Sequence, residues 1–109
     1  MQTRSLTLPL RQAVSFGPFS VEFAAMMPAE KSSPRRAQLA ILEYSEENGS
    51  HYLQLPDAQV WPIQFLAQGD AREVGREFSL KVIELSQREL KLEITSSKRF
   101  GIKKGYVPD

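Results

Sequence analysis

The chain has 109 residues, of which 41% are hydrophobic and 25% charged, and its formal net charge is +1. This length and balance are typical of one globular domain with one core, and they exclude a separate catalytic domain. The chain has no cysteine, which excludes disulfides, thiolate nucleophiles and cysteine-bound metals. We therefore expect a single domain over residues 1–109, and the patterns along the chain favour a β-domain.

The first residues, MQTRSLTLPLRQAVSF, lack the sustained apolar run of a signal peptide. No stretch of about 18 consecutive apolar residues follows, so no transmembrane segment is expected. We therefore expect a soluble, cytoplasmic protein. A secreted form from which a signal peptide had been removed would carry the same sequence, and it stays open as an alternative.

Two runs of alternating apolar residues lie near the N-terminus: Leu6, Leu8 and Leu10, then Phe19, Val21, Phe23 and Ala25. A period of two is what a strand with one buried face requires. The break between the runs contains Gly17 and Pro18, which are typical of turns. We expect a strand in each run.

Residues 37–46 carry apolar side chains on both faces, which fits either a strand buried on both sides or a short helix. Asn48-Gly49 follows, and this pair is the strongest short-range signal of a two-residue hairpin turn, because both residues tolerate positive φ. With this pair at the tip, three pairs are expected: Glu46–His51, Tyr44–Leu53 and Leu42–Leu55. Apolar positions then coincide across the hairpin, which favours two strands over a helix.

Residues 56–77 contain two prolines, two glycines and the single tryptophan, Trp61. Because proline cannot donate to a central ladder, we expect an edge strand or an irregular crossover here. Asp70 and Glu73 have the spacing of a capping box, but Gly75 weakens any helix that follows. At most one helical turn is expected.

A second hairpin is predicted between residues 77–85 and 89–96. The apolar phase changes inside the first strand but not inside the second, and a β-bulge near Lys81-Val82 would reconcile the two. The expected pairs are Leu85–Leu90, Ile83–Leu92 and Leu80–Ile94. Short alternating runs separated by Gly and Pro favour an all-β fold: a small antiparallel β-sandwich or β-barrel of about six to eight strands.

Catalytic, metal and cofactor sites are not expected. His51 is the only histidine and is predicted beside a hairpin tip, so a catalytic triad or a multi-histidine metal site has little to draw on. Asp57 and Asp70 are predicted in loops without calcium-loop spacing. We therefore expect a non-enzymatic protein with no catalytic residue, no metal and no cofactor.

The C-terminal segment departs from the rest of the chain in charge. Four cations, Lys98, Arg99, Lys103 and Lys104, are interleaved with Phe100, Ile102 and Tyr106. Cations among aromatics are typical of surfaces that bind single-stranded nucleic acid, and they would also suit an acidic protein or an anionic lipid. A basic tail over residues 98–109 fits this pattern. A last strand that buries Phe100 and Ile102 while its lysines face water fits it equally.

Elimination then favours a non-enzymatic binding or assembly module that recognises a macromolecular partner, preferably a protein. One alternative is a small β-barrel that binds nucleic acid through the basic C-terminal segment, and another is a β-barrel that holds a small ligand. Association of identical chains through a sheet edge is also open. The candidate partner-binding residues are Lys98, Arg99, Lys103, Lys104, Tyr106, Arg35, Arg36 and Trp61.

Overall fold

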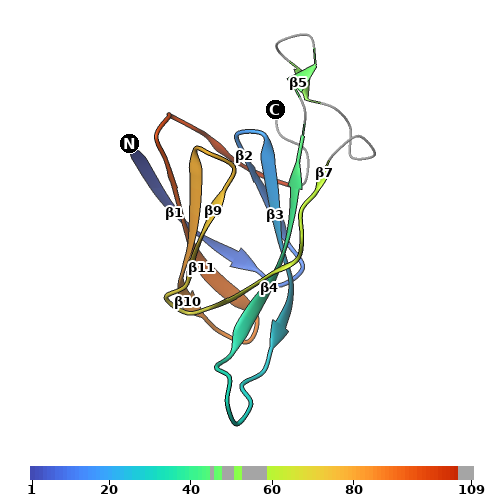
Figure 1. Ribbon diagram of the computed structural model, residues 1–109, viewed down its shortest axis with the longest axis vertical. Helices are drawn as coiled ribbons and strands as arrows, with labels where there is room; N and C mark the ends of the chain where they lie inside the picture. Colours follow the sequence, from blue (N-terminus) through green and yellow to red (C-terminus); the bar gives the residue numbers. More distant parts are fainter. Residues whose placement is uncertain (45, 48–50, 53–58, 106–109) are drawn as a thin grey trace.

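The computed structural model describes residues 1–44, 46–47, 51–52 and 59–105. The expected all-β fold is confirmed, because these residues form strands and turns and no helix. Among them there is accordingly no helix that is long and apolar enough to cross a membrane. Two antiparallel sheets pack against each other as a sandwich (Figure 1), and between the described strands no pairing closes the sheets into a barrel.

The first sheet has the strand order β1-β11-β10-β9. Its strands are β1 (Gln2–Pro9), β9 (Ala71–Val74), β10 (Phe78–Leu85) and β11 (Glu89–Ser96). The second sheet has the order β12-β2-β3-β4, and both β7 and β8 pair with the far side of β4. Its strands are β2 (Ala13–Phe16), β3 (Phe19–Met27), β4 (Arg36–Glu43), β7 (Gln59–Val60), β8 (Gln64–Ala67) and β12 (Ile102–Lys104).

A two-stranded ribbon, β5 (Glu46–Glu47) and β6 (His51–Tyr52), lies apart from both sheets. The described residues form twelve strands, against the expected number of about six to eight, and eight of them, β1 to β4 and β8 to β11, are four residues long or longer. The remaining four are pairs or triplets of residues. The expected limit of one helical turn also holds for the described residues.

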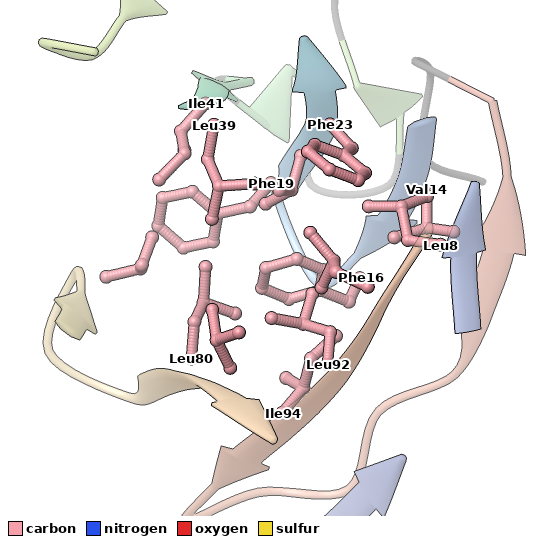
Figure 2. Close-up of a cluster of buried hydrophobic side chains, with 14 of the residues drawn as sticks. Leu8, Val14, Phe16, Phe19, Phe23, Leu39, Ile41, Leu80, Leu92 and Ile94 are labelled. Atoms are coloured by element: carbon pink, nitrogen blue, oxygen red, sulfur yellow. The ribbon is translucent and has the colours of Figure 1, made fainter. Parts of the chain in front are cut away.

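The core lies between the inner faces of the two sheets (Figure 2). The second sheet contributes Phe19, Val21 and Phe23, and the first contributes Leu80, Leu92 and Ile94, all at most 3% exposed. Burial of each such side chain stabilises the fold by about 1.5–3 kcal/mol before entropy is counted. These residues alternate along their strands, which is why the sequence pattern identified them.

The predicted hairpin of β10 and β11 is confirmed, with bounds within one residue of those expected. Leu80 pairs with Ile94, and Leu85 pairs with Leu90, as expected. The bulge lies between Val82 and Glu84, slightly beyond its predicted place. Leu92 consequently faces Val82, and the expected pair with Ile83 is wrong, because Ile83 is itself the extra residue of the bulge.

Residues 36–43 form a strand and not a helix, as expected. The register predicted for the following hairpin is wrong by one residue, since Glu46 pairs with Tyr52 and Glu47 pairs with His51. Three residues, not two, therefore separate the paired positions. The tip at Asn48-Gly49 itself lies outside the described residues, as does Leu53, the expected partner of Tyr44.

The expected pair of Leu42 with Leu55 is also wrong, because Leu42 lies opposite Val60 of β7. The predicted pair required the chain to fold back onto β4 directly after a turn at Asn48-Gly49. In the structure the described residues after Glu43 that first pair with β4 are those of β7.

The segment between the hairpins forms the edge strands β7 and β8, in agreement with the expected edge or crossover. Asp70 closes a turn after β8: its Oδ2 accepts from the Ala67 N–H at 2.9 Å, and its own N–H donates to the Ala67 carbonyl at 3.0 Å. The chain then crosses to the first sheet as β9. Asp70 is thus a turn residue and does not begin a helix.

Candidate partner-binding surface

Residues 97–101 carry the chain from β11 in the first sheet to β12 in the second. Phe100 anchors this crossing: it is 9% exposed, and its ring meets that of Phe78 edge-on at 5.5 Å between centroids. The Phe100 N–H donates to Gln2 Oε1 at 3.0 Å, and its carbonyl accepts from Arg4 Nη1 at 3.3 Å. Side chains of the edge strand β1 therefore hold the crossing segment in place through hydrogen bonds to the backbone of Phe100.

The chain continues as β12, the edge strand beside β2. Lys103 pairs with Ser15, and Lys104 pairs with Val14. Gly105 extends the contact, because its N–H donates to the Ala13 carbonyl at 2.9 Å and its carbonyl accepts from the Ser15 hydroxyl at 2.7 Å. Residues 98–105 are thus a docked edge strand and its approach, not a loose tail. Tyr106 and the residues after it lie outside the described part of the chain.

The cations of this segment differ in their surroundings. Lys98 Nζ lies 2.8 Å from Glu77 Oε1, and the hydrogen bond and charge of Glu77 raise the pKa of Lys98. Arg99, Lys103 and Lys104 are exposed. Glu77 therefore compensates part of the positive charge of this segment at Lys98.

An open hollow of about 700 Å³ lies beside this segment, between the start of β1 and residues 97–101. Its wall includes Gln2, Ser97, Lys98 and Arg99, so donors outnumber apolar groups. Amide, hydroxyl and cationic donors in one hollow suit a carboxylate or another small anion. Among the described residues no cluster of acids and histidines could hold a metal ion.

The sequence did not point to Arg4, which the fold brings to the same surface. Arg4 shares the phase of Leu6 and Leu8 and pairs with the core residue Ile94. It is nevertheless exposed, because β1 is an edge strand and leaves room for the side chain to turn outward. A cation in the apolar phase of an alternating run is the signal that could have identified it. We call Arg4, Lys98, Arg99, Lys103 and Lys104 the basic edge.

Arg35 and Arg36 lie away from the basic edge. Lys104, Val14, Val21 and Ile41 form one row across the second sheet. Arg36 starts β4, five residues from Ile41, which is about 17 Å along the strand. Its guanidinium stacks over Phe65 at 5.6 Å, while Arg35 Nη1 donates to the Leu85 carbonyl at 3.4 Å.

Trp61 lies beside β4, at the opposite edge of the same sheet from β12. Its ring is partly buried and meets Phe19 edge-on at 5.7 Å. Its Nε1 donates to Glu43 Oε1 at 3.0 Å. These contacts give Trp61 a structural role, and the structure does not bring it to the basic edge. The chain matches no protein-family model, no curated protein and no solved structure.

Proposed function

We propose that this protein is a non-enzymatic binding module that recognises an acidic segment of a partner protein through the basic edge. The observation that carries this proposal is the docking of residues 98–105. Their cations lie on an edge strand and on the crossing segment before it, which Phe100, Gln2 and Ser15 fasten to the sandwich. A preorganised surface loses less conformational entropy on binding than a flexible basic tail would lose.

Charge and backbone both favour an acidic peptide as the ligand. The basic edge offers positive charge along one side of the sandwich, which attracts carboxylates and steers their approach. β12 pairs with β2 on one side only, so its other side is open to an extended segment in the described structure. Pairing of a peptide with an exposed sheet edge is a common mode of recognition.

A protein ligand is favoured over single-stranded nucleic acid because Phe100, the aromatic residue among the described residues 98–105, is buried. Bases stack on exposed aromatic rings, but the Phe100 ring faces Phe78 in the core. Ile102 is partly buried and packs against the same core. The formal net charge of +1 is also small for a protein that binds a polyanion through its whole surface. The basic edge is thus better suited to a short run of carboxylates than to a polyphosphate backbone.

The proposal is tested by fluorescence anisotropy with two labelled probes, an octaglutamate peptide and a single-stranded oligothymidine of equal charge. The double variant Lys103→Glu, Lys104→Glu should weaken peptide binding by about tenfold or more. The matched control is Lys31→Glu, Arg35→Glu, which makes the same change of charge on a distant loop and should shift binding less than about twofold. Both variants should fold, since surface substitutions usually change stability by about 0.5 kcal/mol or less.

Equal losses in the two double variants would show that only overall charge matters and would contradict the proposal, as would the absence of peptide binding. Tighter binding of oligothymidine than of peptide, with a steep salt dependence, would favour the nucleic-acid alternative instead. Capture from a lysate with and without nuclease would then identify the natural partner of whichever class binds.

A further inference from the structure

The free side of β12 presents backbone groups that an added strand can pair with. The Gly105 N–H donates to the Ala13 carbonyl, so the backbone turns toward β2 at this position. Positions that face the partner strand and positions that face away alternate along an antiparallel pair. The N–H and carbonyl groups of Ile102 and Lys104 therefore point away from β2. Within the described part of the chain, no hydrogen bond occupies these outward groups.

A strand that pairs antiparallel with β12 ends beside the open hollow described above. Such a strand runs from Lys104 toward Ile102, opposite to the direction of β12. The next residue along its path is Gly101, which lines the hollow of about 700 Å³. Residues 97–101 lead away to β11 in the first sheet, so the ladder of the second sheet ends here. The C-terminal end of an antiparallel partner therefore arrives at the hollow.

The wall of the hollow suits a terminal carboxylate. Arg99 is exposed and has no partner among the described residues, so its guanidinium is available to both oxygens of a carboxylate. Gln2 Oε1 accepts from the Phe100 N–H, which leaves the amide nitrogen of Gln2 as a donor for a ligand. Lys98 adds a second cation, although Glu77 compensates part of its charge.

The hollow also has room directly ahead of β12. A Cβ added to Gly101 would meet no atom within 4 Å, so no side chain of the described residues fills this place. Side chains of a paired strand point to the two faces of the sheet, whereas its terminal carboxylate lies in line with the backbone. The group that reaches the hollow is therefore the end of the main chain and not a glutamate or aspartate side chain.

We propose that the acidic partner segment is the C-terminus of its chain, paired antiparallel with β12 and bound in the hollow through its terminal carboxylate. Arg99 and Gln2 are the residues that contact this carboxylate. The inference rests on the proposed function, because it names the end of the partner that the basic edge recognises. A parallel strand would bring an amino terminus to Arg99, and like charges there would oppose binding.

Two peptides of equal formal charge test the inference by fluorescence anisotropy. Both carry the label on the N-terminus: one is octaglutamate with a free C-terminus, and the other is nonaglutamate with an amidated C-terminus. The extra side chain of the second peptide replaces the charge that amidation removes. The dissociation constant should be at least about fivefold lower for the free-acid peptide, since its terminal carboxylate gains charge-assisted hydrogen bonds in the hollow.

Two variants locate the origin of this preference. Arg99→Gln should reduce the ratio of the two dissociation constants to about twofold or less, because it removes the main contact to the carboxylate. The matched control is Lys104→Gln, which also removes one charge from the basic edge but lies outside the hollow. It should weaken the binding of both peptides alike and leave their ratio unchanged. Circular dichroism confirms that each variant is folded.

Paramagnetic broadening of backbone amide signals tests the direction of the bound peptide. A nitroxide placed next to the C-terminal residue of the free-acid peptide should broaden the signals of Arg99 and Gly101 more than the signal of Gly105. A nitroxide near the N-terminus should have the opposite effect. Stronger broadening of Gly105 by the C-terminal label would refute the antiparallel direction.

The outcomes separate this inference from the proposed function. Equal dissociation constants for the two peptides would overturn the inference while the proposed function stood. Binding of neither peptide would contradict both. An equal loss of preference in Arg99→Gln and Lys104→Gln would also overturn the inference, because the preference would then not come from the hollow.

Discussion

Phe78 of β10 packs its ring directly against the backbone of Gly17, in the turn between β2 and β3. A Cβ added to Gly17 would lie 2.6 Å from Cζ of Phe78, far inside normal carbon–carbon contact. Gly75 stands in the same relation to Phe19, at 2.9 Å. A turn in each sheet therefore contacts a ring from the other sheet, and both glycines help the two sheets to approach.

Gly17→Ala should lower the free energy of unfolding by about 2 kcal/mol or more. Part of this cost is backbone strain, because φ of Gly17 is +53°. The remainder comes from displacement of the Phe78 ring in a packed core, typically about 1–3 kcal/mol. Urea denaturation followed by the fluorescence of Trp61 measures the change.

The matched control for this prediction is Gly101→Ala. A Cβ at Gly101 meets no atom within 4 Å, and its φ is not in the left-handed region. This substitution should change stability by about 0.5 kcal/mol or less. Similar losses in both variants would show that the contact between Gly17 and Phe78 contributes little.

Leu92→Ala should cost about 2–5 kcal/mol, the usual range for a fully buried leucine. Leu92 is 0% exposed and lies between Val82 and Leu6 on the neighbouring strands. Lys91→Ala on the outer face of the same strand should change stability by about 0.5 kcal/mol or less. Equal urea midpoints for the two variants would contradict the observed register.

The β10–β11 hairpin could be predicted because its signals are local. Leu90, Leu92 and Ile94 keep one phase, so only the position of the bulge had to be inferred. β2 gave no such signal. All four of its residues are buried, and the Ser15 hydroxyl on its outer face donates to the Gly105 carbonyl, 90 residues away. No period of two marks a strand that is covered on both faces.

The candidate site was predicted only in part, for a related reason. The alternation of Phe100 and Ile102 with lysines allowed either a tail or a strand, and contacts with Gln2 and Phe78 decide for the strand. Whether Arg36 and Lys104 lie on the same surface depends on the strand order and on the register of the strands. The pattern of charges along the sequence does not encode either of them. The sequence therefore indicated the basic residues but not which of them share a surface.

Tyr44 predicts a specific pH dependence at alkaline pH. Its side chain is 2% exposed, and burial raises the pKa of the phenol above 10.0, while the nearby Ser20 hydroxyl acts in the opposite direction. That contact is poorly aligned, since within the described residues neither hydroxyl oxygen has a hydrogen-bond partner of standard geometry. The folded state therefore binds the phenolic proton more tightly than the unfolded state does.

The sign of the effect follows from this difference in proton binding. Below about pH 10 both states keep the proton, and the contribution of Tyr44 to stability is constant. Above about pH 10 the unfolded state loses its proton first, so stability falls as pH rises toward the folded pKa. Tyr44→Phe should remove this part of the decline, giving a shallower loss of the urea midpoint above about pH 10.

Ser20→Ala provides the control of opposite sign. It removes the hydroxyl that lowers the pKa of Tyr44, so the decline above about pH 10 should become steeper. Lys98, whose pKa Glu77 raises, also contributes to the alkaline loss, but it is present in all three proteins and its effect cancels in the comparison. Parallel pH profiles for the three proteins would contradict a raised pKa of Tyr44.

At neutral pH, Tyr44→Phe should change stability by about 1 kcal/mol or less, because the hydroxyl it removes forms no well-aligned hydrogen bond within the described residues.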